Sequence, residues 1–300
     1  SVHDSFWRPC AIQATNRAVS MWVPKMDDTI HVTPAVAWPE KVAPQSCWAA
    51  HPIKSRVMLC GVAIDPLTMR EVVSAVEQCL DDGNSLAIGM VNVAKLVNMQ
   101  RDPLLRESVA ISDLVLADGA PLVWLSRIKR TPLPERVAGI DLMFELFTLS
   151  DARGFRVYLL GGTKEVLGRV VEIARQKYPG MVIAGHRDGY FPSSQEQEVA
   201  QAIRDSQADM LFVAMTSPQK EVFMKKWSPV MAVPVCHGVG GSFDVMAGVT
   251  RRAPRWMQRV GLEWFFRLSA DPRRLWRRYL IYNPKFLFHI SLQLLGLRRY

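Results

Sequence analysis

The sequence predicts an α/β fold in which a mostly parallel sheet carries helices on both faces, followed by a basic helical appendage at the C-terminal end. Two observations lead to this prediction. Between residues 57 and 239, short apolar runs alternate with amphipathic segments of helical length. Uninterrupted apolar runs are typical of strands buried on both faces, as the strands of parallel sheets are. After residue 250 the pattern changes to arginines interleaved with tryptophan, phenylalanine and leucine.

The expected elements follow one another in a Rossmann-like order. The predicted strands are 57–64 (a strand or a hairpin), 86–91, 114–118, 155–160, 181–186, 210–215 and 233–239. The predicted helices are 68–80, 93–99, 121–130, 140–152, 165–177 and 194–204. The first helix opens with a capping box formed by Thr68 and Glu71. In sheets of this kind, ligands bind outside the carboxyl ends of the strands.

The composition divides the chain into three regions. Residues 1–55 lack periodicity and are rich in proline, so we expect a poorly ordered N-terminal extension; the alternative is that its isolated tryptophans dock on the body or on a membrane. We expect residues 56–250 to form the α/β catalytic core. We expect residues 251–300 to form a basic amphipathic appendage that docks on a membrane.

The net charge of +9 is concentrated at one end of the chain. The last fifty residues contain twelve Arg or Lys and two acids, a balance of +10, which leaves −1 for the first 250. A cationic tail indicates an anionic partner: a membrane surface, a diphosphate or nucleic acid. Arginines beside Trp and Phe are typical of helices that lie in a membrane interface. Alternatively, these aromatics pack on the body while the arginines remain solvated.

Several features favour a reduced, cytoplasmic environment. The five cysteines are dispersed, and we see neither a signal-peptide pattern nor an uncharged run long enough to span a bilayer. We therefore expect a peripheral protein on the cytoplasmic face of the inner membrane.

Asp118 is the best candidate for a general base. It follows an apolar strand and precedes Gly119, where partial burial could tune the pKa of its carboxyl; a carboxylate that caps the next helix is the alternative. Gly161 and Gly162 also follow a strand and could admit a phosphate or a ribose, although the full GxGxxG pattern is absent. Asp244 could bind a ribose or a base, or could be a turn residue.

Sugar transfer from a nucleotide diphosphate needs a base and positive charge for the departing diphosphate. The sequence contains no Asp-x-Asp pair of the kind that holds a metal in many such enzymes. If the protein is a glycosyltransferase, we expect no metal and no organic cofactor, with arginines neutralising the diphosphate instead.

The chain from about residue 57 to 280 resembles the WecG/TagA/CpsF glycosyltransferases (glycosyltransferase family 26). The resemblance rests on these stretches: VNVAKLVNMQRDP (91–103), SDLVLADGAPLVW (112–124), LPERVAGIDL (133–142), VYLLGG (157–162), GYF (189–191), GVGGSFDVMAG (238–248) and RAPRWMQRVGLEWFFRL…PRRLWRRYL (252–280). They are long, ordered and correctly spaced over roughly three quarters of the chain.

This resemblance implies an inverting, metal-independent transfer of a hexose from a UDP-sugar to a polyprenyl-diphosphate-linked sugar in bacterial surface or exopolysaccharide biosynthesis. It implies that Asp118 is the base. The other positions that it assigns to the substrates are Asn92, Arg136 and Asp244 in the pocket, and Arg267, Arg274 and Arg277 in an appendage that closes over the site and touches diphosphate and membrane.

The sequence departs from the family pattern in two ways. Met90 stands where members commonly have Thr. The usual Pro-Lys-Gln-Glu is replaced by a sequence with its middle pair exchanged, in which Gln219 and Glu221 flank Lys220. We place Gln219 and Glu221 among the substrate-binding residues. The exchange leaves both an N-acetylmannosamine-type and a glucose-type donor open; the oligomeric state, including a homo-oligomer, is also left open.

Two other functions compete with this one. A nucleotide-binding dehydrogenase on a doubly wound sheet would require a GxGxxG turn and an acid about twenty residues later, and neither is well formed. A non-enzymatic adaptor for membranes or nucleic acid would use only the basic tail, which leaves the matched strand-end residues without a purpose. We therefore expect a UDP-sugar, a lipid-linked acceptor and an anionic membrane surface as partners, and no nucleic acid.

Overall fold

The structure is a computed structural model that describes residues 55–259 and 261–270, and eleven further positions: 272, 273, 276, 281, 282, 284–286, 288, 290 and 291. The predicted N-terminal extension lies outside the described residues except for Ser55, and so do Arg274 and Arg277. The described residues all belong to one compact unit.

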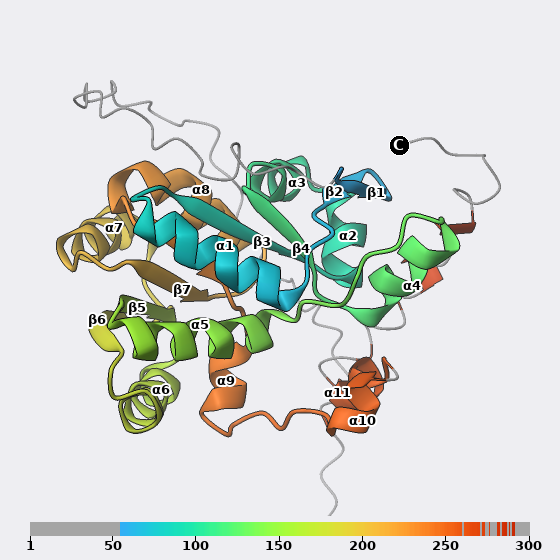
Figure 1. Ribbon diagram of the computed structural model, residues 1–300. Coiled ribbons are helices and arrows are strands. Elements are labelled where there is room, and N and C mark those ends of the chain that lie inside the picture. Colours follow the sequence, from blue (N-terminus) through green and yellow to red (C-terminus); the bar gives the residue numbers. More distant parts are fainter. Residues whose placement is uncertain are drawn as a thin grey trace, which may run out of the picture. The chain divides into compact units, whose positions relative to one another are not determined.

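A six-stranded sheet forms the centre of the protein, and every strand pair in it is parallel. The strand order is β4-β3-β8-β7-β5-β6 (Figure 1). The strands are β3 (Leu86–Val91), β4 (Leu114–Ala117), β5 (Arg156–Gly161), β6 (Val182–Arg187), β7 (Met210–Ala214) and β8 (Val235–Gly238). The predicted parallel α/β fold is confirmed.

The first apolar run forms a separate hairpin. Strands β1 (Val57–Leu59) and β2 (Val62–Ile64) pair in antiparallel fashion. Cys60 and Gly61 make the turn between them with positive φ angles of 47° and 77°. Beyond the hairpin, Asp65 donates its backbone N–H to the carbonyl of Val115 and accepts the N–H of Val115 on its carboxylate, so the hairpin is tied to β4.

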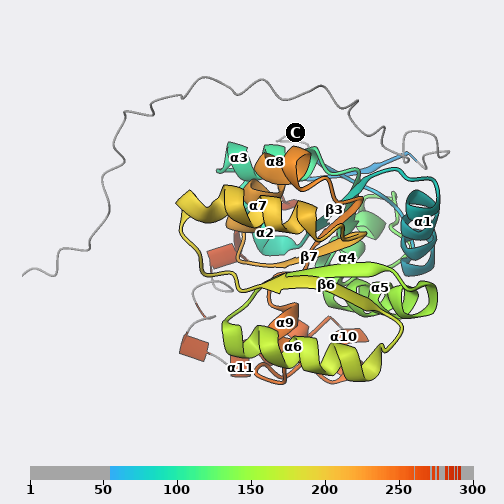
Figure 2. The same ribbon diagram turned by 90° about the vertical axis from the view of Figure 1, so that its left-hand side faces the viewer.

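Helices cover both faces of the sheet (Figures 1 and 2). One face packs against α1 (Met69–Asp81), α5 (Gly139–Arg153), α6 (Lys164–Lys177) and α9 (Ser242–Met246). The other packs against α2 (Val93–Met99), α3 (Pro103–Ala110), α4 (Ala120–Ile128), α7 (Glu196–Asp205, preceded by a 3₁₀ turn Ser193–Gln195) and α8 (Gln219–Met231). Alternate strand residues supply the two cores: Leu114 and Leu116 face α1 and α5, whereas Val115 and Ala117 face α2 and α4.

Most predicted helices end within one or two residues of the observed ones. The capping box is confirmed, because Thr68 accepts the N–H of Glu71 and the Glu71 carboxylate accepts the N–H of Thr68. Three helices, α3, α8 and α9, were not predicted. The sequence pattern does not predict α8, because two of its buried positions are Lys220 and Glu221, which break the apolar period. Pro229 also lies inside this helix.

The basic region contains two short helices, α10 (Arg255–Arg259) and α11 (Glu263–Ala270). Further along, Phe286 is buried in the core between the hairpin and α2, so the C-terminal region contributes to the packing of the body. Within the described residues, none of the helices combines the length and the apolar character that crossing a bilayer requires.

Candidate active site

Asn92 and Asp118 lie side by side at the carboxyl edge of the sheet. They follow neighbouring parallel strands whose last residues, Val91 and Ala117, are in register. The backbone N–H of Asp118 donates to the carbonyl of Val91 at 2.7 Å, which ties the two strand ends together. The side-chain oxygen of Asn92 accepts the N–H of Lys95 at 3.0 Å and caps α2. Asn92 therefore has a structural role that fixes its side chain beside Asp118.

The protein surroundings make Asp118 a stronger base than an ordinary carboxylate. Burial raises the pKa of the Asp118 carboxyl, and the negative charge of Glu263 adds to the increase. The positive charges of Arg267, Arg136 and Lys95 act in the opposite direction. None of the described residues makes a hydrogen bond or an ion pair with the Asp118 carboxylate. Asp118 is also still partly exposed to solvent. The carboxylate can therefore receive a proton from a ligand.

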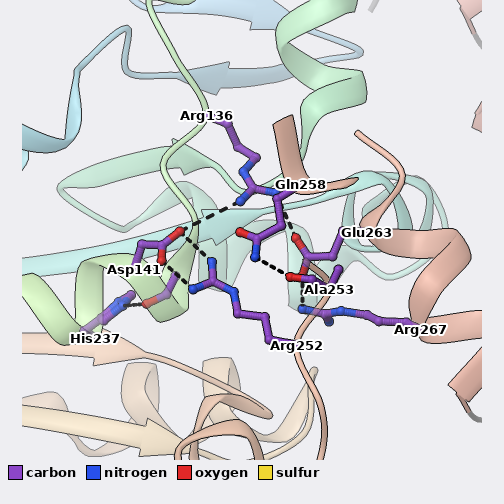
Figure 3. Close-up of polar contacts among 9 residues, drawn as sticks. Arg136, Asp141, His237, Arg252, Ala253, Gln258, Glu263 and Arg267 are labelled. Carbon is purple, nitrogen blue, oxygen red and sulfur yellow. Dashed lines mark hydrogen bonds and ion pairs between the residues drawn. The ribbon is translucent and has the colours of Figure 1, made fainter. Parts of the chain in front are cut away.

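Arg136 reaches this edge because the segment before α5 runs along β4. Val137 donates its N–H to the carbonyl of Ala117, the residue before Asp118. The guanidinium of Arg136 then donates to Oε2 of Glu263 on α11, with Nη1 and Oε2 2.9 Å apart. Oε1 of the same glutamate accepts a hydrogen bond from Arg267, one turn further along α11 (Figure 3).

A second carboxylate extends this arrangement towards the segment before α10. Asp141 in the first turn of α5 accepts a two-pronged hydrogen bond from Arg252, with both N–O distances 2.7 Å. Its Oδ2 also lies 3.8 Å from Nη2 of Arg136. Charges thus alternate in the order Arg267, Glu263, Arg136, Asp141 and Arg252 (Figure 3). We call these five residues the arginine–carboxylate chain; its formal charge is +1.

A buried ion cluster lies between α2, the helix that Asn92 caps, and α8. The ammonium of Lys95 donates to the carbonyl of Met90 and lies 2.8 Å from Oε1 of Glu221. Lys220 contacts the same oxygen. Burial would raise the pKa of Glu221, but the two lysines outweigh it and lower that pKa to about 2. Burial, reinforced by the charge of Lys95, lowers the pKa of Lys220 to about 8.

Two of the residues that depart from the family pattern, Met90 and Lys220, are in the interior. Met90 is buried in the main core next to Gly139, and Lys220 belongs to the ion cluster. His237 on β8 is also buried: its Nε2 lies 3.0 Å from the carbonyl of Gly139, and burial lowers its pKa to about 4. His237 is therefore neutral at pH 7. Its Nδ1 and the second carboxylate oxygen of Glu221 are buried without a hydrogen-bond partner among the described residues.

The remaining predicted positions lie at other points of the same edge. Gly161 ends β5 and Gly162 follows it; a side chain on Gly161 would overlap the backbone of Ala214. The φ angles of the two residues are 121° and 69°, a backbone conformation that favours glycine. Asp244 is half-buried in α9.

Exposed Gln219 begins α8 and accepts a hydrogen bond from Thr216. Among the described residues, no group of three or more His, Cys, Asp or Glu side chains could hold a metal ion.

The sequence model described as "Glycosyl transferase WecG/TagA/CpsF family" matches residues 57–300. The chain belongs to the WecG/TagA/CpsF glycosyltransferase family. Two similar proteins are named N-acetylglucosaminyldiphosphoundecaprenol N-acetyl-beta-D-mannosaminyltransferase. The protein from Bacillus spizizenii is 36% identical over 201 residues, which cover 67% of this chain and 77% of the relative. The protein from Bacillus subtilis is 39% identical over 169 residues, which cover 56% and 65%.

The structure adds charged residues to this candidate site that the sequence analysis did not select: Lys95, Asp141, Lys220, Arg252 and Glu263. A lysine in the first turn of an amphipathic helix gives no sign that it is buried, so Lys95 could not have been found. The sequence does contain an indication of Glu263. It is the only acid between residues 251 and 270, in a segment that is otherwise basic.

Proposed function

We propose that this glycosyltransferase transfers a hexose from a UDP-sugar to a sugar carried on a polyprenyl diphosphate, with inversion at the anomeric carbon and without a metal ion. The observation that carries the proposal is the placement of the Asp118 carboxylate beside Asn92, within the influence of Arg136 and Arg267. The names of the two Bacillus relatives, which specify a diphosphoundecaprenol-linked acceptor and a mannosaminyl group, support the acceptor class.

In the proposed reaction, Asp118 removes the proton from the acceptor hydroxyl as that oxygen attacks the anomeric carbon. The new carbon–oxygen bond forms on the face opposite the leaving group, and the bond between the anomeric carbon and the phosphate oxygen breaks. UDP departs with the electron pair, and the proton remains on Asp118. A single displacement of this kind inverts the configuration.

Arginines supply the positive charge that the departing diphosphate requires. Arg136 and Arg267 are both close enough to influence Asp118, and a guanidinium can donate two parallel hydrogen bonds to phosphate oxygens. Arg274 and Arg277 are proposed to add to this charge. Transfer by the purified protein should therefore be unchanged after dialysis against EDTA. Activity that disappears with EDTA and returns with Mg²⁺ or Mn²⁺ would contradict the metal-free part of the proposal.

The donor pocket is proposed to lie along the carboxyl edge from Asn92 to Asp244, with Gly161, Gly162, Gln219 and Glu221 contributing. A ligand that uses Glu221 has to reach a carboxylate that is 8% exposed and paired with two lysines. Both an N-acetylmannosamine-type and a glucose-type hexose remain candidates.

We further propose that the protein works as a peripheral protein at the cytoplasmic membrane face in polysaccharide biosynthesis. Its lipid-linked acceptor lies at that surface, and Trp256 and Phe265 in the basic region are more than half exposed.

The decisive experiment is a screen of UDP-sugars against synthetic polyprenyl-diphosphate-linked sugars, with product anomers determined by NMR. The proposal expects transfer from at least one UDP-hexose with inverted configuration. Hydrolysis alone, transfer only from another nucleotide sugar, or retention of configuration would contradict it. Thermal stabilisation by NAD and not by UDP would favour the dehydrogenase instead.

A further inference from the structure

Glu263 connects the basic appendage to the body through both oxygens of one carboxylate. Oε2 accepts from Arg136 in the segment before α5, and Oε1 accepts from Arg267 on α11 itself. Glu263 is 15% exposed, whereas Arg267 is 47% exposed. The carboxylate is thus the more enclosed partner, and it holds an arginine from each side.

The Glu263 carboxylate also reduces the repulsion between positively charged arginines. Arg136, Arg267 and Arg252 come from three different segments and converge on the edge where Asp118 lies. Like charges brought together in partly buried surroundings repel one another unless carboxylates separate them. Asp141 separates Arg252 from Arg136, and Glu263 separates Arg136 from Arg267. Glu263 therefore lowers the repulsion between Arg136 and the more exposed Arg267.

An apolar contact just before α11 also helps to dock this part of the chain on the body. Gly261 lies against the ring of Trp124 on α4; a Cβ atom at this position would be 2.6 Å from that ring. Its φ of +71° also favours glycine. Leu262 donates its N–H to Met257 at 2.8 Å, so α10 and the start of α11 form one folded corner. This corner places Glu263 next to Arg136, two residues after the contact with α4.

We propose that Glu263 is a positioning residue for glycosyl transfer: its carboxylate clamps α11 to the segment before α5 and so holds Arg267 and Arg136 beside Asp118. This inference rests on the proposed function, because it assigns the two arginines to the departing diphosphate. Burial alone would raise the pKa of Glu263, but Arg267 and Arg136 together hold it below its ordinary value. Glu263 therefore remains charged at the pH of the reaction.

The first test measures the clamp without any substrate. In full-length Glu263→Gln, amide hydrogen exchange of residues 255–269 should become faster by roughly tenfold or more, because opening of the segment costs less free energy. The matched control is Glu77→Gln. That change removes the same charge from another contact between two segments, Glu77 on α1 with Arg153 on α5, and exchange in 255–269 should be unchanged. Equal exchange in both variants would overturn the clamp.

The second test asks whether Glu263 acts through Arg267. Glu263→Gln should lower kcat for the UDP-sugar by roughly tenfold or more while KM changes much less, since the arginines act on charge that develops in the transition state. In an Arg267→Gln background, the same change should cost less than about threefold, because residues acting as a unit are not additive. Full additivity of the two losses would show that Glu263 does not work through Arg267.

Two further outcomes keep the test decisive. If Glu263→Gln does not fold, Glu263→Asp retains the charge on a shorter side chain, and its kcat should fall between the wild-type value and that of Arg267→Gln; a wild-type kcat would contradict the clamp. If no UDP-sugar is transferred, the proposed function fails while the exchange experiment still decides the clamp. Normal transfer with unchanged exchange removes the clamp alone.

Discussion

Val137 donates its backbone N–H to the carbonyl oxygen of Ala117 at 3.1 Å, so the segment before α5 continues along the edge of β4. This bond places Arg136 next to the residue that follows Ala117, which is Asp118. The two residues are separated by a helix in the sequence and brought together by one backbone contact. The candidate base and an arginine of the site therefore share a rigid support at the end of a buried strand.

Asp118→Asn should lower turnover by about 100-fold or more while UDP binding stays nearly the same. An amide is close in shape to the carboxylate but cannot accept the proton of the acceptor hydroxyl. Steady-state transfer and calorimetric titration with UDP check the two halves of this prediction. Asp82→Asn is the control, because exposed Asp82 lies in the turn before the amino end of β3, whereas Asp118 follows the carboxyl end of the neighbouring strand β4. Near-normal turnover in Asp118→Asn would remove this residue from the mechanism.

The value of kcat/KM should also decrease at acidic pH, because the environment of Asp118 raises the pKa of its carboxyl. A general base works only when deprotonated, so kcat/KM should fall as pH decreases through the pKa of Asp118. Burial raises that pKa, so the acidic limb should lie above about 3.9, the ordinary value for aspartate. A profile of kcat/KM between pH 3 and 9 checks this. A limb at or below the ordinary value would mean that another group limits the rate.

The sequence could predict the fold because each buried strand is a continuous apolar run, and the site only in part. Asp118 was selected because it directly follows such a run and precedes a glycine, and because the resemblance assigns the base to this position. Arg136 was assigned by resemblance alone, since nothing in its neighbourhood indicates that it returns to the end of β4. Lys95 and Glu221 form a pair across α2 and α8 that depends on the tertiary fold, and no local pattern encodes it.

Glu221→Gln should strongly destabilise the protein, because Lys95 and Lys220 would remain buried without a counter-charge. Breaking a buried ion pair in this way costs about 3–5 kcal/mol of unfolding free energy. Denaturant titration measures the loss. The control is Glu107→Gln, which removes the partner of Lys225 from a contact in which Glu107 is 63% exposed; exposed pairs contribute about 1 kcal/mol or less. Equal losses in the two variants would contradict the structural role of the buried cluster.

The same cluster predicts how stability responds to acid. The pKa of Glu221 is lowered to about 2 in the folded protein, whereas an unfolded chain has about 4.3 for glutamate. A carboxyl with a lowered pKa stabilises the fold above the unfolded value and loses that contribution as pH falls towards the folded value. The stability difference between wild type and Glu221→Gln should therefore be largest above about pH 5 and should shrink between pH 4 and pH 2.

Exposed aromatics in the basic region should contribute to membrane binding. Trp256 on α10 is 62% exposed and Phe265 on α11 is 52% exposed, in a region where arginine is the commonest charged residue. Each arginine near an anionic surface contributes on the order of 1 kcal/mol, and burying a large apolar side chain contributes about 1.5–3 kcal/mol. The double variant Trp256→Ser and Phe265→Ser should therefore bind anionic liposomes roughly tenfold or more weakly in flotation assays, while its net charge is unchanged.

The control for this variant is Leu104→Ser, because Leu104 is a similarly exposed apolar residue (51%) on α3, outside the basic region. Turnover with a short-chain, water-soluble acceptor should remain close to normal in the double variant, since neither aromatic belongs to the arginine–carboxylate chain. Raising the salt concentration should weaken liposome binding of both wild type and variant, because the arginines act through screened charges. Unchanged flotation of the double variant would mean that the aromatics do not enter the interface, and that any attachment depends on the arginines alone.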